Sequence, residues 1–194
     1  ADLERCLTPR TKAIMPVHLG GVAVDMDPVL DFAKKHDLKI VEDTAQSCGS
    51  YYKDRHVGTL GDVGCFSFQL EKNITSGEGG VAVMEDAELY RRAVIYGDQG
   101  GQFWTSHAGV RDTVGGQPVI GENLRMNEIA GAILSCQLKK LSELLNRIER
   151  NRQIVHSALS ETDGVRLAPV VPERDRHGLS VLMYMPSPDK AKTV

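Results

Sequence analysis

Three side chains that could do chemistry together lie in or just after short strand-like runs of this chain. Asp43 follows the run 39–42, Ser67 lies in the run 63–68, and Lys72 comes five residues after Ser67. In open α/β sheets ligands bind at the carboxyl ends of the strands, so an acid, a hydroxyl and an amine at such ends can converge on one small molecule. Alone the pattern is weak, because most lysines are solvated and the glycines that follow Lys72 are equally typical of turns.

The segments that must position these residues alternate between strand-like and helix-like patterns. Residues 11–21 have the pattern of a strand that ends in a glycine turn, and Asp25 with Pro28 is typical of a helix start. The strand 39–42 follows this helix. Strand, helix and strand in this order form the βαβ unit of a parallel sheet. The sequence therefore predicts an α/β fold with a mostly parallel central sheet flanked by helices.

Composition narrows the class of protein. With 194 residues, 41% of them hydrophobic, the chain is long enough for one large domain. A net charge of −3 gives no indication of nucleic acid or an anionic membrane as partner, and neither a membrane-spanning run nor a signal peptide is evident. The four cysteines lie far apart, which argues against a metal site or disulfides and favours small buried thiols in a reduced, cytoplasmic protein.

Four motifs taken together carry a family resemblance. Residues 41–46, 61–68, 72–73 and 77–80 resemble the DegT/DnrJ/EryC1/StrS family of pyridoxal-phosphate aminotransferases, and the likeness extends from about residue 14 to residue 152. The resemblance implies the fold of the aspartate aminotransferase superfamily (fold type I). It also implies an enzyme that aminates a nucleotide-linked keto-sugar or a keto-cyclitol, with glutamate or glutamine as amino donor.

The same resemblance implies a role for each cofactor-binding residue. Lys72 is similar to the lysine that forms the internal aldimine with pyridoxal 5′-phosphate and then moves the proton, for which its amine must be neutral. Asp43 resembles the carboxylate that keeps the ring nitrogen protonated, since an opposite charge within reach favours the charged form. Gln46 resembles the residue that reaches the ring or its O3′ hydroxyl, and Ser67 the hydroxyl that binds the phosphate.

A second motif, residues 121–128, implies a partner. Asn123 resembles an asparagine that reaches the phosphate in the other subunit of a homodimer, so that the active site is shared. Local physics offers a plainer interpretation of this segment, because Asn127 followed by Glu128 is a good helix start. Arg125 is a candidate structural contact.

Simpler interpretations stay open for most of these residues. Asp43 alone is typical of a turn or helix cap, and Gln46 of a surface glutamine. His18, near a strand end, could be a ligand, a base or part of the site lining, but a hydrogen-bonded structural histidine is more common. Trp104, in the glycine-rich segment 97–121, could stack on a substrate ring or clamp the loop to the body.

The resemblance also implies that the chain is divided into three structural parts. Residues 1–126 form part of the cofactor-binding large domain, 127–160 a long interdomain or dimer helix, and 161–194 the start of a small α+β C-terminal domain. Because the family's phosphate-binding turn and ring-stacking aromatic are not identifiable, we expect an internal piece of a longer enzyme. The alternatives are a noncatalytic cofactor-binding domain and another fold type I enzyme, such as a desulfurase.

Overall fold

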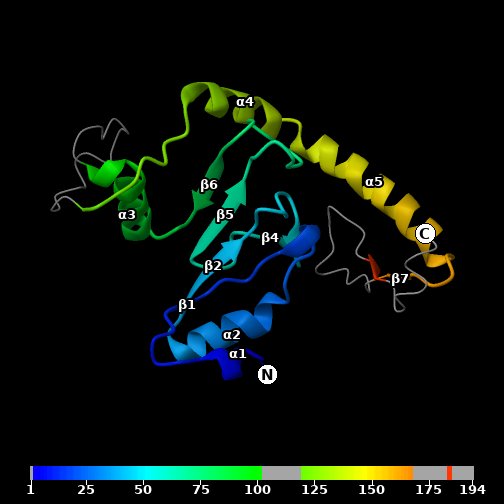
Figure 1. Ribbon diagram of the computed structural model, residues 1–194, viewed down its shortest axis with the longest axis horizontal. Coiled ribbons are helices and arrows are strands. Elements are labelled where there is room, and N and C mark those ends of the chain that lie inside the picture. The colour runs from blue at the N-terminus through cyan, green and yellow to red at the C-terminus, as the bar shows by residue number, and fades with distance from the viewer. Residues whose placement is uncertain (1, 102–118, 168–182, 185–194) are drawn as a thin grey trace.

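A four-stranded sheet forms the centre of the computed structural model, which describes residues 2–101, 119–167 and 183–184. The strand order is β1-β2-β5-β6, in which the first three are parallel and the last is antiparallel to its neighbour (Figure 1). The strands are β1 (Ala13–Ile14), β2 (Lys39–Asp43), β5 (Val63–Ser67) and β6 (Gly80–Val83). The predicted α/β fold with a mostly parallel sheet is confirmed.

One core cluster joins the sheet to the first long helix. Buried Met26, Val29 and Ala33 of this helix lie in a cluster with Ile40 of β2, because the helix returns the chain to a parallel neighbour strand. The helix begins at Met26, directly after Asp25, and Pro28 is its third residue rather than its first. Its preceding Asp25 side chain makes no capping bond and instead accepts a hydrogen bond from the Tyr52 hydroxyl. The α-helices before residue 100 are α1 (Asp2–Cys6), α2 (Met26–His36) and α3 (Ala87–Gly97).

The segment 127–160, expected as one long helix, is divided in two. α4 (Glu128–Leu138) and α5 (Leu141–Ser160) are separated by two lysines. Asn127 caps α4, as the sequence suggested, by accepting a hydrogen bond from the Ala130 amide. Figure 1 shows α4 above the carboxyl end of β5 and α5 leading away from it. A second core cluster packs them there, with Cys48, Phe68, Ile74 and Leu134 buried and Leu141 and Leu144 beside them.

Short elements complete the described chain. A short antiparallel hairpin follows β2, and two further short strands, at 166–167 and 183–184, pair antiparallel. The elements are η1 (Leu19–Gly21), β3 (Tyr51–Tyr52), β4 (Arg55–His56), η2 (Gln99–Gly101), β7 (Arg166–Leu167) and β8 (Met183–Tyr184). The three-part domain division stays a prediction. None of the helices in the described ranges is long and apolar enough to cross a membrane.

The prediction that all four cysteines are small buried residues is wrong. Cys48 is buried in the second core cluster, and its burial raises the pKa of the thiol to about 11. Cys6 and Cys136 are exposed, because α1 buries no residue and Cys136 lies on the outward side of α4. In the described parts of the chain no group of three or more potential metal ligands comes together.

Candidate active site

Asp43 and Ser67 lie at the carboxyl ends of neighbouring parallel strands. The register of β2 and β5 places Asp43 beside Cys65, two residues before Ser67. One carboxylate oxygen of Asp43, Oδ1, accepts a hydrogen bond from the Ala45 amide at 3.0 Å, so the side chain also starts the turn that follows. Burial and the nearby charge of Asp43 both raise the pKa of the Cys65 thiol. Asp43 therefore forms a turn contact through Oδ1, and this contact is compatible with a role of its carboxylate at a binding site.

Lys72 is held on a loop that is closed at its base. This loop joins β5 to β6, and the Phe68 amide donates to the Gly79 carbonyl at 2.9 Å across its neck. The side chain of Asn73 donates to the Cys48 carbonyl at 2.8 Å, which ties the loop to the turn after β2. Lys72 itself is half-buried, and its Nζ makes no hydrogen bond or ion pair with any described residue. The backbone is anchored, while the amine has no partner in the part of the chain that the structure describes.

Lys72 and Gln46 line the same cavity. The cavity has a volume of about 310 Å³, and α5 contributes one apolar residue to its wall. Oε1 of Gln46 accepts a hydrogen bond from the Gly20 amide at 2.9 Å, which orients the exposed Gln46 side chain. The lining consists of Gly20, Ala45, Gln46, Glu71, Lys72, Asn73 and Ile148. Asp43 and Ser67 are outside this lining, and Asp43 directly precedes the turn that carries Gln46.

A carboxylate on the other side of β2 is enclosed completely. Glu42 is fully buried, and its Oε1 accepts from the amides of Leu60 and Gly61 at 2.7 and 2.6 Å. Its Oε2 accepts from the Gly58 amide at 2.7 Å and from Nε2 of His18 at 3.0 Å. Burial favours a higher pKa for Glu42, but the hydrogen bonds from His18 and the three amides outweigh it and hold the pKa below its usual value. The side chain is therefore an ionised structural group.

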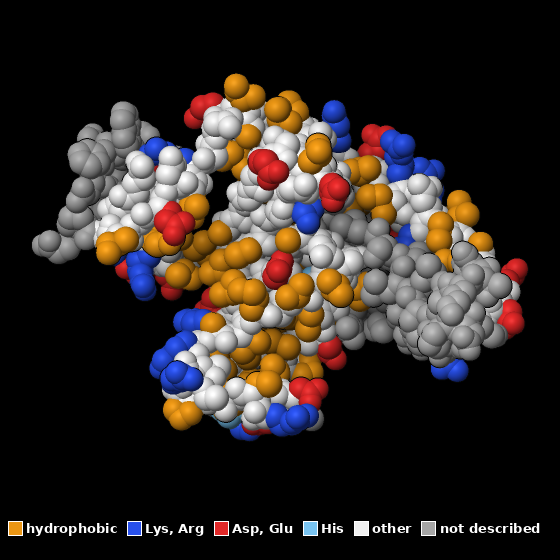
Figure 2. All heavy atoms as spheres, in the orientation of Figure 1, with side chains coloured by type: hydrophobic (Ala, Val, Ile, Leu, Met, Phe, Trp, Pro, Cys, Tyr) orange, Lys and Arg blue, Asp and Glu red, His pale blue; other side chains and the backbone are white. Residues whose placement is uncertain are grey.

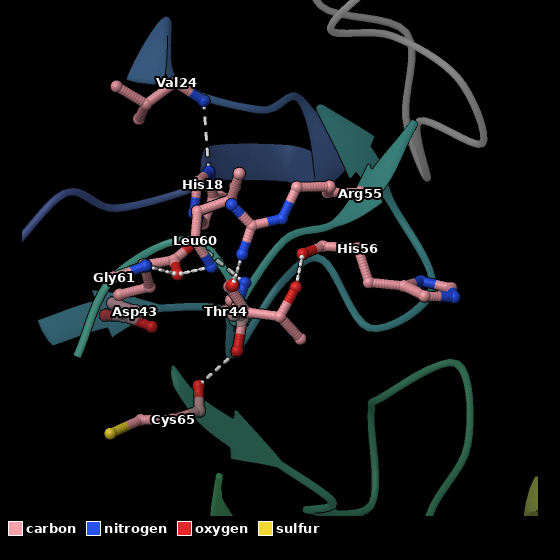
Figure 3. A network of polar contacts seen from close by, with 12 residues as sticks. His18, Val24, Asp43, Thr44, Arg55, His56, Leu60, Gly61 and Cys65 are labelled. Carbon is pink, nitrogen blue, oxygen red and sulfur yellow. Dashed lines mark hydrogen bonds and ion pairs between the residues drawn. The ribbon is translucent and has the colours of Figure 1, made fainter. Parts of the chain in front are cut away.

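His18 is the hydrogen-bonded structural histidine that was the more common expectation. Its ring is fully buried and takes no part in lining the cavity, and its Nδ1 accepts a hydrogen bond from the Val24 amide at 3.0 Å. Since Nδ1 accepts, the ring proton lies on Nε2, which donates to Glu42. Figure 3 shows the ring between Val24 and the loop that carries Leu60 and Gly61.

Asn123 and Arg125 lie at a separate place, at the end of α3. Asn123 is exposed and forms an isolated antiparallel bridge with Asp98, and neither Asn123 nor Arg125 lines the Lys72 cavity. The guanidinium of Arg125 pairs with the buried Asp98 carboxylate at 2.6 Å, so it is the structural contact that was considered. Trp104 lies outside the described residues.

Two contributors to this region were not singled out from the sequence. Ile148 reaches the cavity from α5, and nothing in the local sequence marks it. Glu42 had a usable signal, because strand alternation puts it on the same side of β2 as buried Ile40. An acid on a buried face must be paired or hydrogen-bonded, and this identifies it as the centre of a polar network.

Comparison with known proteins identifies the family. The sequence profile of the DegT/DnrJ/EryC1/StrS aminotransferase family matches residues 1–193. The chain belongs to this family. Among its relatives, GDP-perosamine synthase of Caulobacter vibrioides is 40% identical over 154 residues, which are 77% of this chain and 38% of the relative. An L-glutamine:2-deoxy-scyllo-inosose aminotransferase of Micromonospora echinospora is 37% identical over 161 residues, which are 82% of this chain and 38% of the relative.

A solved aminotransferase structure shares the fold. The Helicobacter pylori aminotransferase PseC, involved in the biosynthesis of pseudoaminic acid, superimposes with a TM-score of 0.84 at 27% identity. The match covers 99% of this chain and 50% of that chain. The chain thus spans about half of that structure and 38% of the length of the two curated relatives.

Proposed function

We propose that this chain carries the lysine-bearing part of a pyridoxal 5′-phosphate-dependent aminotransferase. The enzyme transfers an amino group from glutamate or glutamine to a nucleotide-linked keto-sugar or a keto-cyclitol. One observation carries the proposal: the half-buried amine of Lys72 has no partner among the described residues and faces the same cavity as Gln46. Membership of a sugar and cyclitol aminotransferase family supports the substrate class.

The donor set fits the cofactor chemically. Lys72 offers a primary amine for the aldehyde, and Asp43 offers a carboxylate for the ring nitrogen. Gln46 offers an amide for the O3′ hydroxyl, and Ser67 a hydroxyl for the phosphate. The hydroxyl of Ser67 is engaged only weakly, by the Gln69 amide at 3.4 Å. When bound, the cofactor supplies an electron sink for the substrate carbon that loses its proton.

The residues of the chain do the positioning and the proton transfer. With its amine neutral, Nζ of Lys72 would move the proton between the substrate Cα and C4′ of the bound cofactor, because no described residue engages this amine. Asp43 is anchored by its bond to the Ala45 amide, so its carboxylate is held at the strand end and would keep the ring nitrogen of a bound cofactor protonated. The Asn73 bond to Cys48 limits the movement of the lysine loop.

We further propose a homodimer in which Asn123 serves the partner's site. Two features support this: Asn123 is exposed away from the Lys72 cavity, and apolar residues next to it are uncovered. Ile129 of α4 is 75% exposed and Leu124 is 63% exposed. Figure 2 shows hydrophobic side chains at the surface over α4. A cytoplasmic location stays a prediction from composition.

The test is covalent trapping of the cofactor. The purified chain is incubated with pyridoxal 5′-phosphate and reduced with borohydride, and the labelled peptide is identified by mass spectrometry. We expect the label on Lys72, no label in Lys72→Ala, and normal labelling in the control Lys34→Ala, an exposed lysine of α2. Labelling elsewhere, or equal labelling of Lys72→Ala, contradicts the proposal.

Amino transfer separates the remaining alternatives. With glutamine or glutamate and a keto-sugar or keto-cyclitol acceptor, we expect transfer that falls on the order of 10⁴-fold in Lys72→Ala. Label on Lys72 without amino transfer favours a noncatalytic cofactor-binding domain. Sulfur release from cysteine favours a desulfurase instead.

A further inference from the structure

The His18 ring closes a loop of the chain on itself. The loop 19–23 leaves the sheet after Val17, and His18, at its start, accepts a hydrogen bond from the amide of Val24, just past its end. The other ring nitrogen of His18 bonds Glu42 of β2. The His18 backbone is fixed as well, because its amide donates to the Asp43 carbonyl at 3.0 Å. Both the side chain and the backbone of His18 are therefore attached to the end of β2.

The closed loop holds a cavity residue. Within it Gly20 and Gly21 have φ angles of 62° and 83°, a left-handed conformation that favours glycine. The Ser50 hydroxyl binds the Gly21 carbonyl at 2.8 Å, and the Gly20 amide binds Oε1 of Gln46 at 2.9 Å. Because Gln46 lines the cavity beside Lys72, the position of the loop decides where this amide side chain points.

The other end of the network is rigid. The amides that surround Glu42 belong to a loop packed directly on β5, where a Cβ added to Gly64 would lie 2.0 Å from the Gly58 carbonyl oxygen. Gly58 is therefore held in close contact with the backbone of β5. Glu42 is buried and its four hydrogen bonds come from fixed donors, so it gives His18 a single position.

We propose that Glu42 and His18 are positioning residues for Gln46. The ionised carboxylate fixes the ring with its proton on Nε2, the ring fixes the loop 19–23, and the Gly20 amide then fixes Gln46 in the cavity. The network itself follows from the contacts above. Its consequence for ligand binding rests on the proposed function, because it assumes that Gln46 contacts pyridoxal 5′-phosphate.

The first test needs no cofactor. Hydrogen exchange of the Gly20 amide, followed by NMR, is compared among the wild-type chain, His18→Gln, Gln46→Ala and the control His56→Gln, which removes an exposed histidine of β4. We expect exchange about tenfold faster in both His18→Gln and Gln46→Ala, and no change in His56→Gln. Unchanged exchange in His18→Gln overturns the inference.

A measurement on the unmodified chain covers the case in which His18→Gln does not fold. The ¹⁵N shifts of the His18 ring should show a neutral imidazole with the proton on Nε2. A ring protonated on Nδ1 would be unable to accept from Val24, and this result also overturns the inference.

The second test uses binding of pyridoxal 5′-phosphate. We expect affinity about tenfold weaker in His18→Gln and in Gln46→Ala, and the double variant no weaker than Gln46→Ala alone, because both act through one contact. Additive losses, about a hundredfold in the double variant, contradict the inference. If the wild-type chain binds no cofactor, the proposed function fails while the Gly20 exchange result still decides the positioning inference.

Discussion

Two regions near the end of β2 differ in whether their charged side chain has hydrogen-bond partners. In one region the Glu42 carboxylate is fully buried and accepts four hydrogen bonds, three from backbone amides and one from His18. In the other region, just beyond the end of β2, the Lys72 amine lies in a cavity without a partner among the described residues. A charge whose bonds are all satisfied contributes to stability, whereas a group without a partner remains available to a ligand. The two regions should therefore separate stability from chemistry.

The largest expected effect tests this separation directly. Glu42→Ala leaves three backbone amides and a buried imidazole without an acceptor, so we expect the free energy of unfolding to fall by about 3–5 kcal/mol. Lys72→Ala removes no hydrogen bond seen among the described residues, so we expect a change within about 0.5 kcal/mol. Urea unfolding of both variants checks this. Equal losses would show that the two regions do not differ.

Two glycines sharpen the contrast. Gly64→Ala would place a methyl group 2.0 Å from the Gly58 carbonyl oxygen, and we expect a loss of about 3 kcal/mol because backbone cannot move aside. At Gly77, in the lysine loop, no atom of the described residues lies within 4 Å of an added Cβ, and the φ angle of 88° is what opposes alanine. We expect Gly77→Ala to lower the free energy of unfolding by about 1 kcal/mol. Thermal or urea unfolding checks both variants. A larger loss of stability in Gly77→Ala than in Gly64→Ala would contradict the view that the Glu42 region is tightly packed and the lysine loop is open.

The pH dependence of stability should also follow Glu42. Its pKa is lower in the folded chain than its ordinary value of 4.5, so its stabilisation is present above that pH and is lost as the pH falls through the folded-state pKa. Over that acid range Glu42→Gln should show a slope shallower by up to about 1.4 kcal/mol per pH unit. Parallel slopes in urea unfolding would argue against an ionised Glu42. Glu42→Gln should still lose some stability as the pH falls, because the pKa of Asp62 is lowered as well.

The smallest effect concerns the contact that joins the two regions. Asn73→Ala removes the bond to the Cys48 carbonyl and should lower the free energy of unfolding by about 1 kcal/mol. Amino transfer should fall more than this loss suggests, because the lysine loop is freed. Asn73→Asp cannot donate and serves as the size-matched comparison. If Asn73→Ala lowers stability while transfer stays normal, the contact does not position Lys72.

Local pattern predicted much of the fold. The strand, helix and strand order led to the parallel sheet, and Asn127 forms the capping bond typical of such a residue. Other details were wrong because they depend on tertiary packing. The 127–160 segment divides where α4 and α5 pack separately against the lysine loop, and the exposure of Cys136 depends on which side of α4 faces that core.

The sequence by itself determined the family, the α/β class and the candidate residues, because motif residues and strand periodicity are local features of the chain. Only the tertiary structure decided what surrounds each side chain. It brought Gln46 next to Lys72, set Asn123 apart from them, and enclosed Glu42 with His18 and the amides of a loop 16 to 19 residues further on. Whether a charge is satisfied depends on groups that are distant in sequence, and their meeting is a property of the folded chain.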